Sequence, residues 1–227
     1  MIKGVIFDMD GTMFDTERLS AISWKKAGEK LHLDIQDELI DKIQGRNPAA
    51  IRKVFMGRFG EDLDYDGARR VKHEFFEEMT KEGIPVKKGL KELLEYLKES
   101  GIPAVVATST ERIRAEAFIK RAGVYDYFTD CVYGDLIQAS KPAPDIFLEA
   151  AAKIGQDPGD CVVLEDSSVG LQAAVAAGSY AIYIPDVAKV PDEIQRKADA
   201  KLADLSQVIG WIKEKEKRIR HTCRLRI

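Results

Sequence analysis

The sequence predicts an α/β protein, in which helices cover an open parallel sheet and an all-helical segment is inserted after the first strand. Two observations carry this prediction. Short β-branched runs that are apolar throughout alternate with helical patterns, as expected for strands buried on both faces of a parallel sheet. Between about residues 16 and 83, by contrast, only helical periodicity occurs.

Five strands are expected from these apolar runs. The runs are GVIFD ending at Asp8, PAVVATS ending near Thr108, DCVYG around residue 132, CVVLED ending at Asp166, and YAIYIP ending at Pro185. Three helical patterns lie between them: Leu90, Leu93, Leu94 and Leu97 before Gly101; Ile113, Ala117 and Phe118 before Gly123; and PDIFLEAAAKIG from Pro144 to Gly155. A proline at the start and a glycine after the end are typical of helices.

The inserted segment has apolar residues at helical spacing in four stretches. They are Leu19, Ile22 and Ala27; Leu39, Ile40 and Ile43; Ile51, Val54 and Phe55; and Val71, Phe75 and Met79. We therefore expect two domains: a discontinuous α/β core of residues 1–15 and 84–227, and a small helical domain of residues 16–83. Glycine and proline mark the expected hinges, around Thr16 and around Pro85.

Composition and charge exclude several classes of protein. The chain of 227 residues is 45% hydrophobic and 32% charged with a net charge of -3, which is typical of a globular protein and gives no overall field to attract nucleic acid or an anionic membrane. The basic end, KEKEKRIRHTCRLRI, is interpreted as a solvated helix end. The uncharged stretch from Ser167 to Pro185 is interpreted as a buried helix and strand, since glycines interrupt it. We expect a small-molecule partner, no nucleic acid and no membrane, and favour a monomer.

The cysteines and the first residues indicate the compartment. Cys131, Cys161 and Cys223 form no C-x-x-C pair and are too few for a disulfide framework, which favours a reducing compartment. Acidic residues occur within the first ten positions, so the start does not resemble a signal peptide. The sequence therefore predicts a cytoplasmic protein.

An acidic pair follows the first expected strand, in the segment VIFDMDGTMFDT of residues 5–16. Asp8 and Asp10 lie close together, and the carboxyl ends of parallel strands meet at one edge of the sheet, which brings Glu165 and Asp166 to the same edge. Oxygen ligands alone suit Mg²⁺. A calcium-binding EF-hand loop is excluded, because Met13 and Leu19 occupy the positions of its glycine and glutamate. Taken alone, the DG pair could also be a turn or a helix cap.

Four motifs together resemble those of the haloacid dehalogenase-like hydrolase superfamily in order and spacing. They are FDMDGTMFDT at residues 7–16, Thr108 in VVATST, Lys141 in SKPAPDIF, and VLEDSSVGLQAAVAAG at residues 163–178. The pattern is most similar to the branch that contains β-phosphoglucomutase and sugar phosphatases. This resemblance implies a Rossmann-like core with a helical cap domain inserted after the first strand, and it extends to about Trp211.

The resemblance also implies roles for these residues. Asp8 is expected to be the nucleophile that forms an aspartyl-phosphate, and Asp10 the general acid and base. Thr108, Ser109 and Lys141 are expected to bind the phosphate, although a threonine or serine there could also cap a helix. The expected Mg²⁺ ligands are Asp8, the backbone carbonyl of Asp10, Glu165 and Asp166.

Substrate choice is expected to depend on the helical insertion. The candidate residues there are Trp24, Gln44, Gly45 and Arg46, although Trp24 could equally be a plain core aromatic. The sequence departs from the mutase, since Ser20 occupies the position of its cap histidine and Pro48 that of its cap-loop arginine, although Arg46 or Arg52 could replace that arginine. The departure favours a phosphatase that acts on a small phosphomonoester, such as a sugar phosphate. A sugar phosphomutase and a non-catalytic phosphate-binding regulatory domain remain as alternatives.

Overall fold

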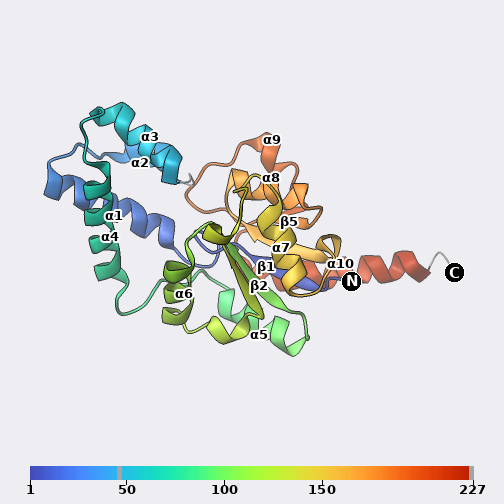
Figure 1. Cartoon of the computed structure of the whole chain (residues 1–227). Coiled ribbons are helices and arrows are strands. Elements are labelled where there is room, and N and C mark those ends of the chain that lie inside the picture. Colours follow the sequence, from blue (N-terminus) through green and yellow to red (C-terminus); the bar gives the residue numbers. More distant parts are fainter. Residues whose placement is uncertain (45–47, 225–227) are drawn as a thin grey trace. The chain divides into compact units, whose positions relative to one another are not determined.

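The structure is a computed structural model that describes residues 1–44 and 48–224. The chain divides into two compact units: a core unit of residues 1–14 and 86–227, and an inserted unit of residues 15–85. Figure 1 shows the inserted unit as helices α1 to α4, coloured from blue through cyan to green-teal. Each unit is described by itself below.

The core unit contains a six-stranded parallel sheet in the order β3-β2-β1-β4-β5-β6, which confirms the predicted α/β class. The strands are β1 (Gly4–Phe7), β2 (Ala104–Thr108), β3 (Asp130–Tyr133), β4 (Cys161–Glu165), β5 (Tyr180–Tyr183) and β6 (Ala200–Lys201). The direction of the strand order reverses between β1 and β4, and in open α/β sheets ligands bind at the carboxyl ends of the strands beside such a reversal.

The sixth strand was not expected. β6 contains only two residues, of which Ala200 is partly buried and Lys201 exposed. An edge strand of this length and polarity gives no apolar run, so the sequence carries no signal for it.

Helices connect the strands of the core unit. They are α5 (Leu90–Glu99), α6 (Arg112–Arg121), α7 (Asp145–Lys153), α8 (Ser168–Ala176), α9 (Asp192–Gln195) and α10 (Val208–Arg224). Four short 3₁₀ helices complete it: η1 (Tyr125–Tyr127), η2 (Gly134–Leu136), η3 (Pro158–Asp160) and η4 (Leu205–Gln207). No helix in the described part of the chain is both long enough and apolar enough to cross a membrane.

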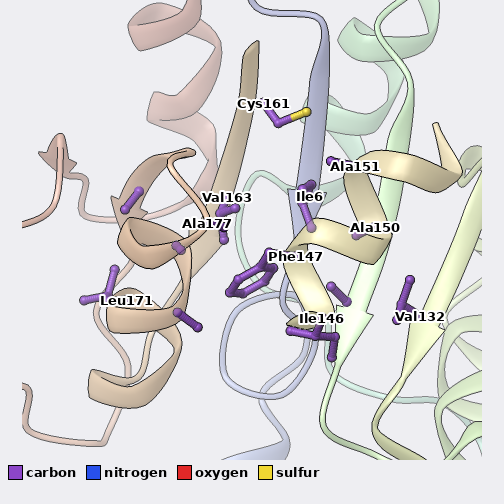
Figure 2. Packing of buried hydrophobic residues seen from close by; sticks show 14 of the residues in the cluster. Ile6, Val132, Ile146, Phe147, Ala150, Ala151, Cys161, Val163, Leu171 and Ala177 are labelled. Carbon is purple, nitrogen blue, oxygen red and sulfur yellow. The ribbon is translucent and has the colours of Figure 1, made fainter. Parts of the chain in front are cut away.

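Helices α7 and α8 cover one face of the sheet. Phe147 of α7 and Leu171 of α8 pack in one buried cluster with Ile6 of β1 and Val163 of β4, as Figure 2 shows. Successive strand residues point to opposite faces, so Phe7 lies on the other side, where its ring meets Phe128 edge-on with 5.6 Å between ring centroids. The packing on both faces fixes the strand ends that position the site.

One predicted helical pattern is only partly right. Phe118 of α6 is fully buried, but Ile113 is 89% exposed. Ile113 lies in the first turn of α6, and its neighbour Arg112 is held by Asp135 rather than by apolar packing. The buried face of α6 instead runs through Ala115, Phe118 and Ile119, so Ile113 lies off this face rather than on it.

The inserted unit is entirely helical in its described part. Its helices are α1 (Thr16–Leu31), α2 (Asp37–Ile43), α3 (Pro48–Phe59) and α4 (Tyr65–Thr80). Trp24, Phe55 and Tyr65 form its aromatic centre, with 4.4 Å between the ring centroids of Trp24 and Phe55. The buried face of helix α4 is offset by one residue from the apolar face predicted for it. Phe76 is buried, whereas Phe75 of the predicted face is only partly buried against the cluster.

Candidate active site

A tight turn follows β1 and presents the first acidic pair. The Met13 and Phe14 amides both donate to the Met9 carbonyl, and Met9, Met13 and Phe14 are fully buried. Gly11 has a φ of +88°, a conformation that L side chains rarely adopt. The apolar side chains thus anchor the turn, and Asp8 and Asp10 lie on either side of Met9 at the carboxyl edge of the sheet.

A buried lysine joins two of the strands. Lys141 Nζ donates to Asp8 Oδ1 at 2.5 Å and to Glu165 Oε1 at 2.7 Å, and all three side chains are buried. Its ammonium group also lies over the ring of Phe147, with 4.8 Å from Nζ to the ring centroid. Lys141 precedes α7, so the ends of β1 and β4 and the start of α7 meet at one ammonium group.

Glu165 and Asp166 lie at the start of α8. The backbone N–H and the hydroxyl of Ser167 donate to Glu165 Oε2 at 2.8 and 3.0 Å, and Ser167 Oγ in turn accepts from the Gly170 amide at 3.0 Å. Thr12 Oγ1 donates to Asp166 Oδ1 at 3.2 Å. Both carboxylates are therefore held in fixed orientations at a helix N-terminus, where negative charge is favoured.

Two glycines allow this close approach. A Cβ atom on Gly170 would overlap the Glu165 carboxylate, and one on Gly11 would overlap the Asp166 carboxylate. Any larger residue at either position would have to displace the acid. The glycines of the motifs DMDG and EDSSVG thus make room for the carboxylates.

The acids could hold a metal ion. Asp8, Glu165 and Asp166 each offer a carboxylate oxygen, and these atoms lie within 4.8 Å of one another. Burial raises the pKa of the Asp8 carboxyl well above its ordinary value; Lys141 opposes this rise and Glu165 adds to it. Burial lowers the pKa of Lys141, but attraction to Asp8 and Glu165 outweighs it and the pKa is raised. The cluster thus has more negative charge than one ammonium balances, which fits a bound cation.

Asp10 has a different neighbour. Thr110 Oγ1 donates to Asp10 Oδ2 at 2.7 Å, and the Asp10 side chain is not among the three grouped carboxylates. Thr108 is buried at the end of β2, where its hydroxyl accepts from the Thr110 amide at 3.1 Å, whereas Ser109 is exposed. The hydroxyl of Thr110 was not identified from the sequence, because a contact that spans 100 residues has no local signature.

Two of the four candidate residues of the inserted unit, Trp24 and Gln44, lie in the described part of the chain. Trp24 is 4% exposed and belongs to the aromatic core, and it also lines a cavity of about 40 Å³ together with Glu17, Ser20 and Gln44. Gly45 and Arg46 lie outside the described residues. The structure thus places Trp24 and Gln44 beside one small cavity, and their contact with a substrate stays a prediction.

Comparison with known proteins agrees with this geometry. The model of the haloacid dehalogenase-like hydrolases matches residues 2–178. Fructose-1-phosphate phosphatase YqaB of Escherichia coli is 33% identical over 182 residues, which cover 79% of this chain and 94% of that protein. β-Phosphoglucomutase of Bacillus subtilis is 27% identical, with coverage of 80% and 82%. A crystal structure of CbbY from Rhodobacter sphaeroides in complex with phosphate has a TM-score of 0.78 at 29% identity, with coverage of 92% and 96%.

The chain therefore belongs to the haloacid dehalogenase-like hydrolase family. The family assignment made from the four motifs is confirmed, and so is the branch, since its relatives include a sugar-phosphate phosphatase and a β-phosphoglucomutase.

Proposed function

We propose that the protein is a Mg²⁺-dependent phosphatase that hydrolyses small phosphomonoesters, sugar phosphates among them. One observation carries the proposal: Asp8, Glu165 and Asp166 are buried together, and Lys141 binds two of them, Asp8 and Glu165, at the edge of the sheet where ligands bind in this fold. The similarity to a fructose-1-phosphate phosphatase supports the substrate class.

Asp8 acts as the nucleophile in this proposal. A carboxylate oxygen of Asp8 attacks phosphorus, the bond between phosphorus and the ester oxygen breaks, and an aspartyl-phosphate forms. Lys141 holds the Asp8 carboxylate through Oδ1 and offsets the negative charge that gathers on the phosphoryl group. Thr108, buried beside Thr110 at the end of β2, supplies a hydroxyl to the same edge.

Asp10 transfers the protons. As the ester bond breaks, Asp10 donates a proton to the departing oxygen, and it then takes a proton from the water that attacks the aspartyl-phosphate. This second step returns Asp8 as a free carboxylate and releases inorganic phosphate. Asp10 suits the role because it is two residues from Asp8 and only partly buried, so that it can exchange protons with a bound substrate.

Asp8, Glu165 and Asp166 would hold the metal ion, together with the backbone carbonyl of Asp10. When bound, Mg²⁺ would offset the charge of the phosphate and orient it for in-line attack. Carboxylate and carbonyl oxygens with no nitrogen or sulfur ligand favour Mg²⁺ over softer metals.

Hydrolysis fits the inserted unit better than a mutase reaction does. A mutase has to grip a second phosphate group, which requires a cation. Among the described residues, the cavity beside Trp24 has one charged lining residue, the acidic Glu17. Such a lining favours the hydroxyl groups of a sugar over a second phosphate.

We also infer that the inserted unit is the cap domain that selects the organic part of the substrate. Its wholly helical structure and its position after β1 support this assignment. The buried thiols of Cys131 and Cys161, which are not in disulfides, suit a reducing, cytoplasmic environment. The proposed partner is a small phosphate ester, with no role for nucleic acid or membrane.

The test measures phosphate release from a panel of phosphorylated sugars and polyols, with Mg²⁺ and with EDTA. Wild-type protein should release phosphate only with the metal, and Asp8→Asn should lower kcat by at least about 10³-fold. Asp126→Asn, an exposed aspartate of η1, is the matched control and should leave kcat unchanged.

Two other outcomes would contradict the proposal. Conversion of a hexose 1-phosphate into the 6-phosphate, in the presence of a sugar bisphosphate and without release of phosphate, would identify a mutase. Inactivity against the whole panel would favour a phosphate-binding regulatory domain.

A further inference from the structure

The loop between β2 and α6 fixes Thr110 at three points. Its backbone N–H donates to Thr108 Oγ1 at 3.1 Å, and its carbonyl accepts from the Gly134 amide at 3.2 Å. Its hydroxyl donates to Asp10 Oδ2 at 2.7 Å. The backbone of Thr110 is therefore held from both sides, and the hydroxyl is aimed at the carboxylate that follows β1.

Helix capping does not explain this hydroxyl. The N-cap residue of α6 is Glu111, so Thr110 lies one position before the residue whose side chain usually accepts from a helix N–H. Here the first helical amide, that of Arg112, instead donates to Asp135 Oδ1 at 3.1 Å. The first amide of α6 thus donates to a residue of another loop, and the hydroxyl of Thr110 donates to Asp10 instead of capping the helix.

We propose that Thr110 is a positioning residue for the proton transfers of Asp10; this inference rests on the phosphatase function proposed above. A threonine hydroxyl has a single proton, and here it is given to Oδ2. With Oδ2 engaged by Thr110, Oδ1 is the oxygen through which Asp10 exchanges a proton with the substrate. The bond also fixes the rotation of the carboxyl group, so that the same oxygen protonates the departing ester oxygen and later accepts the proton of the attacking water.

The experiment compares two substrates that differ in their need for a general acid. An alkyl phosphate, the best sugar phosphate of the panel, has a poor leaving group that needs protonation, whereas p-nitrophenyl phosphate has a good leaving group that does not. The parameter is kcat/KM, because it covers the steps up to formation of the aspartyl-phosphate and so isolates the acid step.

Thr110→Val removes the hydroxyl and keeps the shape, and Thr110→Ser restores the hydroxyl. We expect Thr110→Val to lower kcat/KM for the sugar phosphate about 10- to 100-fold but for p-nitrophenyl phosphate less than about 3-fold. Thr110→Ser should recover most of the loss. Thr129→Val, the same change at an exposed threonine before β3, should affect neither substrate.

A burst experiment tests the base step. In the proposal, Thr110 also positions Asp10 for the attack of water on the aspartyl-phosphate. Thr110→Val should therefore release p-nitrophenolate in a burst close to one equivalent per enzyme, followed by slow turnover. A structural role alone would lower the burst and the turnover together.

The outcomes separate this inference from the proposed function. Equal losses for both substrates in folded Thr110→Val, or no loss for either, would overturn the role of Thr110 while leaving the phosphatase proposal intact. Failure of Thr110→Ser to recover activity would also overturn it. Inactivity of the wild-type protein toward every ester would overturn both.

Discussion

The two units of the chain differ in how many charged side chains they bury. At the edge of the core sheet, Asp8, Lys141, Glu165 and Asp166 are all buried and are tied to one another or to nearby hydroxyl and amide groups. In the described part of the inserted unit, one charged residue is buried, Lys72. Its Nζ lies 6.0 Å from the ring centroid of Trp24 and 5.1 Å from that of Phe76.

We expect this difference to separate the chemistry, in the core unit, from substrate selectivity, in the inserted unit. Buried charges are costly unless their partners are placed accurately, so the core site tolerates little change. The inserted unit is held by aromatic and aliphatic packing, which accepts many substitutions of similar volume. We therefore expect damage to the core site to abolish the reaction, and damage to the insertion to alter stability and substrate preference.

The largest effect is expected from Lys141→Met. The substitution leaves Asp8 and Glu165 buried without their shared ammonium, and removal of one partner of a buried ion pair costs about 3–5 kcal/mol. Denaturant unfolding in EDTA should show this loss, and kcat should fall at least about 10³-fold. Added Mg²⁺ should recover part of the stability, because the proposed site would bind it in the folded state alone.

Lys153→Met in α7 is the matched control. Lys153 pairs with Asp130 at 3.0 Å on the surface, and such pairs contribute about 0–1 kcal/mol. Similar losses of stability for the two variants would contradict the view that the core site tolerates few substitutions because its charges are buried.

Trp24→Ala tests the inserted unit. Loss of this ring from its contacts with Phe55 and Tyr65 should lower the free energy of unfolding by about 3–5 kcal/mol, the usual cost of truncating a large buried aromatic. Below the unfolding temperature, its kcat should fall far less than that of Lys141→Met, because the reacting groups lie in the other unit.

Trp24→Phe separates packing from recognition. It keeps an aromatic ring in the cluster, so we expect most of the stability to return while the cavity of about 40 Å³ widens. KM for a sugar phosphate should then rise more than kcat falls. An unchanged KM would show that this cavity does not receive the substrate.

Gly170→Ala is expected to have a smaller effect on the core site. The added Cβ would overlap the Glu165 carboxylate and force it away from Lys141 and Ser167. Loss of a residue that keeps a metal ligand in position commonly lowers metal affinity or activity 10- to 100-fold, or about 1.4–2.7 kcal/mol. Gly170 has this role toward the proposed ligand Glu165. The measurement is Mg²⁺ affinity by calorimetry together with kcat.

Gly210→Ala is its control in α10, where an added Cβ meets no atom within 4 Å. An alanine in a helix should stabilise the protein by about 0.5–1 kcal/mol there and leave Mg²⁺ affinity unchanged. Unchanged affinity in Gly170→Ala as well would mean that the position of Glu165 does not govern metal binding.

The sequence predicted the parts of the core site that strand ends determine. Asp8 and Glu165 directly follow or end apolar runs, and parallel strands bring their carboxyl ends to one edge, so their proximity could be inferred without coordinates. Lys141 was inferred from the family motif rather than from such a rule. The roles of these residues stay predictions.

Other features could not be inferred, because tertiary packing decides them. The hydroxyls of Thr12 and Thr110 reach acids 154 and 100 residues away, and threonine at such positions is equally typical of a turn or cap. Strand β6 is too short and too polar for a pattern. The buried face of α4 lies one position from the predicted stripe, since apolar residues occur on both sides of that face.

The smallest effect is expected on the surface of the core unit, at Glu116 of α6. Arg112 Nε and Lys120 Nζ donate to its carboxylate at 2.7 and 2.9 Å, and these hydrogen bonds lower the Glu116 pKa to about 2. A folded-state pKa below the unfolded value stabilises the fold above the unfolded pKa, here near 4.5, and this contribution is lost as the pH falls toward 2.

Glu116→Gln should therefore lower the melting temperature at neutral pH by at most about 2 °C, because solvent and salt screen an exposed cluster. The difference from wild type should shrink steadily below about pH 4.5 and nearly vanish at the lowest pH at which both proteins fold. Glu92→Gln, an exposed glutamate of α5, serves as the control. A difference that grows on acidification would contradict the sign of the pKa shift. A loss of stability as large as that of Lys141→Met would contradict the contrast between buried and exposed charge.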